Sequence, residues 1–172
     1  MSHPLALAVF PAVDTAIAAA RALHGIGISR EQISVIARDH AESRALADRM
    51  DATPGVELED SRLAARLGEL SGHVLAAIAL GLPGIGPIVA AGPLAAELGE
   101  AAGHAAGSLA SVLKGAGLPS ARADALQREV AGGAVLVGAH IVGAHIAPPA
   151  VDAVRDALAA AGATTVDVLN WP

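Results

Sequence analysis

Two pairs of polar residues interrupt the apolar middle of the sequence, and each pair is a glutamate and a histidine four residues apart. The pairs are Glu69 with His73 and Glu100 with His104. Residues four apart lie on the same face of a helix. Mixed carboxylate and imidazole groups suit divalent transition metals such as zinc, iron or manganese. These four residues are therefore a candidate metal site, against the simpler alternative of two ordinary helix-surface pairs.

Two further histidines lie near the C-terminus, where the motif GAHI occurs twice. His140 and His145 are five residues apart, so a regular strand places them on opposite faces. Only a bulge, for example at Gly143, would bring them together as ligands. We expect structural or exposed histidines here, and the sequence does not assign them a role. No nucleophile motif, phosphate-binding loop or zinc-protease helix accompanies them, which predicts a protein that is not an enzyme.

The composition narrows the classes of partner. The net charge is −6, with 11 Lys and Arg against 17 Asp and Glu, and the chain has one Phe, one Trp and no Tyr. Nucleic-acid binding needs a basic surface and often aromatic stacking, so we expect no nucleic-acid partner. The chain has no cysteine. This excludes disulfides and thiol chemistry and fits a cytoplasmic protein.

The elements that must position these residues follow from hydrophobic periodicity. Apolar residues alternate or run together as expected for strands at 4–10, 32–38, 134–141 and 164–169, and recur at helical spacing at 13–25, 120–130 and 149–162. This order predicts an α+β fold, a ferredoxin-like antiparallel sheet with an insertion. The predicted divisions are 1–60 for the first half of the sheet domain, 61–117 for the insertion and 118–172 for the second half.

The insertion contains an uncharged stretch at residues 74–96. A single membrane crossing would separate two halves of one sheet, so we expect a helical hairpin that turns at the sequence PGIGP. Each arm has about thirteen uncharged residues, which span about 20 Å, whereas a hydrocarbon core is about 30 Å thick. The hairpin is therefore expected to be buried in protein, to be shared between copies of the chain, or to dip into one leaflet.

Small residues recur every four positions on both predicted arms. Folding about residue 87 would bring three pairs together in a glycine zipper: Gly68 with Gly107, Gly72 with Gly103, and Ala76 with Gly99. Glycine inside a helix costs about 1 kcal/mol relative to alanine, and close helix contact is the usual compensation. Pro93 weakens this prediction because it is expected to kink the second arm.

The sequence also resembles a known family. The segment PGIGPIVAAGPLAA, followed by GLP, a predicted helix and GAVLV, is similar to bacterial general-stress proteins of the YflT-like, heat-induced type. The similarity spans most of the chain apart from residues 39–60. It implies a cytoplasmic or membrane-associated protein linked to stress, and it brings no established catalytic residues. The extended GAHIVGAHIAPP departs from the family pattern.

These observations lead to two functional hypotheses. The first is a non-enzymatic, stress-associated protein that forms homo-oligomers through its glycine-rich hairpin, in the cytoplasm or at the surface of the inner membrane. The second is a metal-binding protein that holds a divalent transition metal with Glu69, His73, Glu100 and His104. No other cofactor is expected. The sequence determines neither the size of the oligomer nor whether the hairpin meets lipid or protein.

Overall fold

The computed structural model describes residues 2–38, 78–82, 84–102, 107–142 and 150–172. Within these ranges, six strands form one antiparallel sheet in the order β3-β4-β2-β5-β1-β6. The strands are β1 (His3–Phe10), β2 (Ile33–Arg38), β3 (Ile78–Leu82), β4 (Gly86–Ala91), β5 (Val135–His140) and β6 (Thr165–Trp171). The helices are α1 (Val13–Gly25), α4 (Pro93–Ala102), α5 (Leu109–Gly115), α6 (Ser120–Ala131) and α7 (Ala150–Ala160), with a 3-10 turn at Arg30–Gln32. The fold is therefore α+β, as the sequence predicts.

The elements predicted at both ends of the chain are confirmed with small shifts of their bounds. β1, α1 and β2 follow one another at the N-terminus, and α6, β5, α7 and β6 at the C-terminus. Strand β1 lies beside both β5 and β6, and β5 lies between β1 and β2. The two halves of the chain thus share one sheet, and both ends of the insertion connect to it.

The helical hairpin predicted at the centre of the insertion is wrong for residues 78–82 and 86–91. These residues form a β-hairpin, in which β3 pairs with β4 from Ile78 opposite Ala90 to Leu82 opposite Gly86. Gly84 and Gly86 take positive φ angles of 80° and 89°, which glycine adopts without strain. Strand β4 then pairs with β2 and extends the sheet. Because β4 is buried on both faces, its side chains do not alternate in polarity, and the run resembles a buried helix in the sequence.

The predicted second arm of the hairpin is also interrupted. Helix α4 begins at Pro93, and a new helix, α5, begins after Ser108, which has extended φ and ψ angles of −132° and 161°. Gly99 lies within α4, and the buried Gly107 precedes the Ser108 cap. The predicted partners on the first arm, Gly68, Gly72 and Ala76, and also Gly103, lie outside the described residues. The zipper contacts therefore stay a prediction, but a turn between helices at residue 87 is excluded because that residue is in β4.

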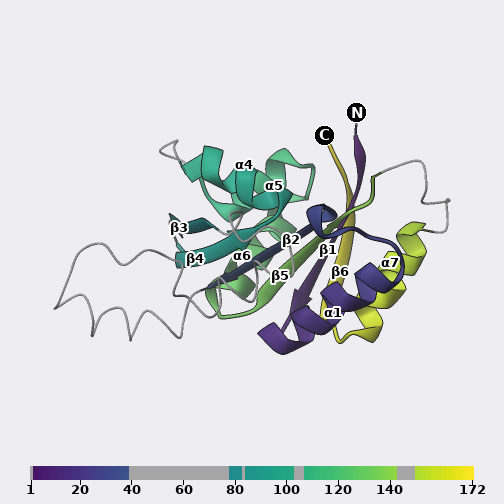
Figure 1. The fold of residues 1–172 in the computed structure, drawn as a ribbon. Helices are drawn as coiled ribbons and strands as arrows, with labels where there is room; N and C mark the ends of the chain where they lie inside the picture. Colours follow the sequence, from purple (N-terminus) through teal and green to yellow (C-terminus); the bar gives the residue numbers. More distant parts are fainter. Residues whose placement is uncertain (1, 39–77, 83, 103–106, 143–149) are drawn as a thin grey trace.

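Helices cover both faces of the sheet (Figure 1). Helices α1 and α7 pack on one face, against small side chains such as Ala6, Ala8 and Val137. Helices α4, α5 and α6 pack on the other face, against larger ones such as Leu5, Leu7 and Ile36. In the described part of the insertion, apolar side chains are thus buried in two extra strands and in the second helical layer.

None of the helices within the described ranges combines the length and the apolar character that a membrane crossing requires.

Candidate functional site

Two polar side chains are buried among the described residues, and they lie on neighbouring strands. Ser34 on β2 is 0% exposed and His140 at the end of β5 is 2% exposed. Ser34 lies opposite Gly138 in the register of the two strands, so His140 is two residues further along β5. Burial of a polar group costs free energy unless a hydrogen bond compensates for it. The partners of these two side chains therefore define the most distinctive site in the interior.

A chain of hydrogen bonds joins these buried groups to the surface. The backbone N–H of Leu94, in the first turn of α4, donates to Oγ of Ser34 over 3.0 Å. This oxygen lies 3.2 Å from Nε2 of His140, and Nδ1 of His140 lies 3.1 Å from Nε2 of the half-buried His3. The Ser34 hydroxyl can donate its hydrogen to Nε2, which leaves the Nδ1 hydrogen of a neutral His140 to point at His3. Each buried side-chain atom of Ser34 and His140 that can form a hydrogen bond then has a partner in this series of hydrogen bonds.

Neighbouring residues hold the His140 ring and its backbone in place. Trp171 meets the ring edge-on, with 5.4 Å between ring centroids and an interplanar angle of 82°. Nε2 of Gln32 donates to the carbonyl oxygen of His140 over 3.0 Å and to that of Val142 over 2.9 Å. The end of β5 is thus tied to the segment that leads into β2. His140 has little freedom to turn.

The environment keeps His140 neutral at ordinary pH. Burial, and to a smaller extent the nearby His3, lowers the pKa of His140 from 6.5 to about 4. Desolvation acts in this direction because it disfavours the charged imidazolium. Both lone-pair and N–H chemistry are therefore available at this ring near pH 7.

The position of α4 relative to Ser34 depends on a close contact between two backbones. Gly92 joins β4 to α4 with a φ angle of 85°, and a Cβ atom there would overlap the carbonyl oxygen of Ile33. Only a residue without a side chain lets the start of α4 lie against β2 in this way. Gly92 thus brings the N–H of Leu94 within reach of Ser34.

A surface cavity of about 470 Å³ lies next to this site, between α4, α5 and the C-terminal residues. Glu97 and Glu100 contribute carboxylates to its lining, and Trp171 and Pro172 contribute apolar surface. Trp171 therefore contacts both the cavity and the His140 ring. The volume lies in the range of small-ligand pockets, about 300–1,000 Å³.

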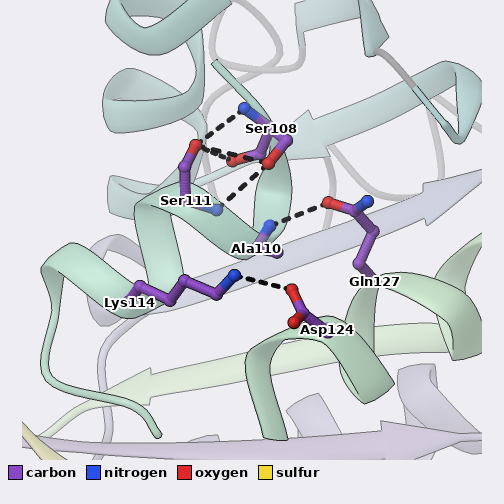
Figure 2. A network of polar contacts seen from close by, with 6 residues as sticks. All are labelled: Ser108, Ala110, Ser111, Lys114, Asp124 and Gln127. Atoms are coloured by element: carbon purple, nitrogen blue, oxygen red, sulfur yellow. Dashed lines mark hydrogen bonds and ion pairs between the residues drawn. The ribbon is translucent and has the colours of Figure 1, made fainter. Parts of the chain in front are cut away.

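Polar contacts fix α5 beside the cavity (Figure 2). Ser108 caps the helix, since its Oγ accepts the N–H of Ser111 over 3.1 Å while Oγ of Ser111 accepts the N–H of Ser108 over 2.8 Å. Such a cap stabilises a helix start by about 1 kcal/mol. The N–H of Ala110 donates to Oε1 of Gln127 on α6 over 2.9 Å. Helix α5 is thereby attached to α6.

The structure describes one of the four residues of the predicted metal site. Glu100 lies on α4 and lines the cavity, whereas Glu69, His73 and His104 lie outside the described residues. His145 lies outside them too. Within the described ranges, no three or more His, Asp or Glu side chains gather where they could hold a metal ion. The four-residue metal site stays a prediction.

Sequence reasoning missed Ser34 and His3 as members of a site. Ser34 is a small polar residue in an otherwise apolar strand, and such residues usually face solvent. His3 is 137 residues from His140 along the chain, and their contact depends on the pairing of β1 with β5. The one available signal was the position of His140 in a strand of buried residues.

Comparisons of the chain with protein families, with curated proteins and with solved structures give no match.

Proposed function

We propose that the chain is a ferredoxin-like domain enlarged by a β-hairpin and a second helical layer. The strand order β2-β5-β1-β6 supports this assignment, since each strand is antiparallel to its neighbours. Helix α1 connects β1 to β2 and helix α7 leads into β6, and these two helices pack together on one face. A βαββαβ unit has this arrangement. Strands β3 and β4 extend it beyond β2.

We propose that the protein is not an enzyme and that it assembles with copies of itself through the edge strand β6. One observation carries this proposal: within the described residues β6 pairs on one side only, and Val168 at its centre is 42% exposed. An unpaired strand edge presents N–H and C=O groups that can pair with another strand. A second β6 in antiparallel orientation would continue the sheet across a two-fold axis.

The chemistry of β6 supports pairing and does not oppose it. Natural proteins protect free edges with lysine, proline or bulges. Strand β6 contains neither lysine nor proline. Its one charged side chain, Asp167, is bound by Nε of Arg122 over 2.8 Å, and Arg122 also donates to Thr165. The hydrogen bond to Asp167 raises the pKa of Arg122. Asp167 is thus paired with a guanidinium on α6, which it shares with Glu129.

The non-enzymatic part of the proposal has support in the burial of Ser34. A serine next to a histidine can act as a nucleophile, but only if substrate reaches its oxygen. Ser34 is fully buried and its oxygen accepts the N–H of Leu94. A structural and positioning role fits these contacts better than catalysis.

Other parts of the initial hypothesis stay predictions. They are the link to stress, the contribution of the glycine-rich segment to assembly, the shallow membrane contact and the cytoplasmic or inner-membrane location. The described helices α4 and α5 are used to cover the sheet, so we place the main contact between copies at β6.

The mass of the particle in solution tests the proposal. Light scattering during size-exclusion chromatography is expected to give a dimer or larger particle for the wild type. If the whole of Thr165–Trp171 pairs with its copy, Val168 lies opposite Val168. Val168→Lys then sets two like charges face to face, which destabilises a strand pair. We expect this variant to be a monomer at the same concentration.

A matched control separates this effect from a general effect of a surface charge. The exposed fraction of Val142, 41%, is similar to that of Val168, but Val142 follows β5 and is not part of β6. Val142→Lys is expected to keep the wild-type mass. A monomeric wild type, or equal masses for both variants and the wild type, would contradict assembly through β6.

A further inference from the structure

The contact between His3 and His140 has the geometry of two ligands on one metal ion. Nε2 of His3 and Nδ1 of His140 are 3.1 Å apart. With metal–nitrogen bonds of about 2.0–2.1 Å, two ligands at a right angle are about 2.9 Å apart and two at the tetrahedral angle about 3.3 Å apart. The observed separation lies between these values. A metal ion can therefore bind both nitrogens with little movement of either ring.

We propose that His3 and His140 form a binding site for a divalent transition metal of the zinc or cobalt type, at the end of the sheet where β1, β5 and β6 meet. Imidazole nitrogen is a preferred ligand of these ions. The two rings come from paired strands, since Leu5 lies opposite His140, and this pairing fixes the distance between them. The two histidines lie on β1 and β5, so this proposal does not rest on assembly through β6.

Ser34 supplies the second contact that a metal-bound histidine needs. When Nδ1 of His140 binds a metal, Nε2 carries the hydrogen and must donate it to an acceptor. Oγ of Ser34 lies 3.2 Å from Nε2 and has a lone pair left after it accepts the N–H of Leu94. A hydroxyl can donate or accept, so Ser34 serves both the metal-free and the metal-bound form of His140.

The proposed site is partly open to solvent through His3. Trp171 covers one side of the His140 ring, and His3 is half-buried and reaches solvent. Since no third His, Asp or Glu joins the pair among the described residues, water or a small anion would complete the coordination there. With two protein ligands, such a site would keep open positions and would not be a closed four-ligand centre.

Titration with zinc chloride tests the site, with isothermal calorimetry on the full chain purified without a histidine tag. We expect His3→Ala to weaken binding at this site at least tenfold. The matched control is His24→Ala, because the half-buried His24 is on α1 and its Nδ1 contacts the carbonyl oxygen of Ile28 over 2.9 Å. The control is expected to bind zinc as the wild type does. Equal binding by the wild type and His3→Ala, or none by the wild type, would overturn the proposal.

Nitrogen-15 spectra of the imidazole rings identify the ligand atoms directly. On addition of zinc, the signals of His3 Nε2 and His140 Nδ1 are expected to shift, while those of His24 stay in place. Shifts confined to other histidines would overturn the proposal. Val168→Lys is expected to retain these shifts, so a failure of assembly and a failure of metal binding can be distinguished.

Discussion

At the scale of single residues, the hydrogen-bond chain from Leu94 through Ser34 and His140 to His3 makes the end of the sheet sensitive to protonation. His140 has a pKa of about 4 in the folded protein and 6.5 as the ordinary value. Folding therefore favours the neutral ring. The stability that the folded protein gains from keeping His140 neutral is complete above pH 6.5. This gain is lost as the pH falls from 6.5 to about 4.

This shift leads to a prediction for the free energy of unfolding in metal-free buffer. The pKa change of His140 corresponds to a loss of about 3 kcal/mol between pH 7.5 and pH 4. Urea denaturation at several pH values measures this loss. His140→Gln has no titrating ring, so its loss over the same interval is expected to be smaller by that amount. Parallel pH dependences of the wild type and this variant would contradict the assigned environment of His140.

Residue types and spacing predict a metal site made of Glu69, His73, Glu100 and His104. They do not predict the contact between His3 and His140. The repeated GAHI motif draws attention to His140 and His145 but assigns them no role. The neighbours of His140 depend on which strands pair and in which register, and a single sequence does not provide that register. The pairs Glu69 with His73 and Glu100 with His104 follow from helical spacing, which is local, and the metal site they would form stays a prediction.

At the scale of elements, the insertion is where hydrophobic periodicity does not predict the secondary structure correctly. Strands β1 and β2 are bounded by turns of recognisable sequence, and their prediction was correct. Strand β4 is covered on both faces, and its sequence GPIVAA carries no polar alternation. Its β-branched Ile88 and Val89 were the available signal for a strand. Length and hydrophobicity alone do not separate a buried strand from a buried helix, so the apolar run predicts a helix where the structure has a strand.

The junction between β4 and α4 gives a prediction for stability. Gly92→Ala places a left-handed alanine against the carbonyl oxygen of Ile33, whereas Gly86→Ala has a similar φ angle and no atom within 4 Å. The left-handed conformation costs about 1–2 kcal/mol at either site. Overlap at Gly92 is expected to add about 1–3 kcal/mol. Thermal or urea unfolding measures both variants, and equal losses would contradict the close approach of the two backbones.

At the scale of the whole molecule, helices cover both faces of the sheet within the described residues, and the edge strand β6 pairs on one side only there. The chain has a net charge of −6, so association must offset some repulsion between copies. We propose that strand β6 meets this requirement because Arg122 pairs with Asp167 and because Val168, at the centre of the strand, is exposed and uncharged. Helices α4 and α5 pack against the sheet, and a glycine-rich contact between copies stays a prediction.

The most direct measurement of assembly through β6 is the mass of a mixture of two variants. Val168→Lys and Val168→Asp each place like charges opposite one another in a symmetric strand pair, and we expect each to be a monomer alone. Mixed in equal amounts, opposite charges meet across the same pair, and light scattering is expected to show the wild-type mass again. A mixture that stays monomeric while the wild type is assembled would show that the copies meet at another surface.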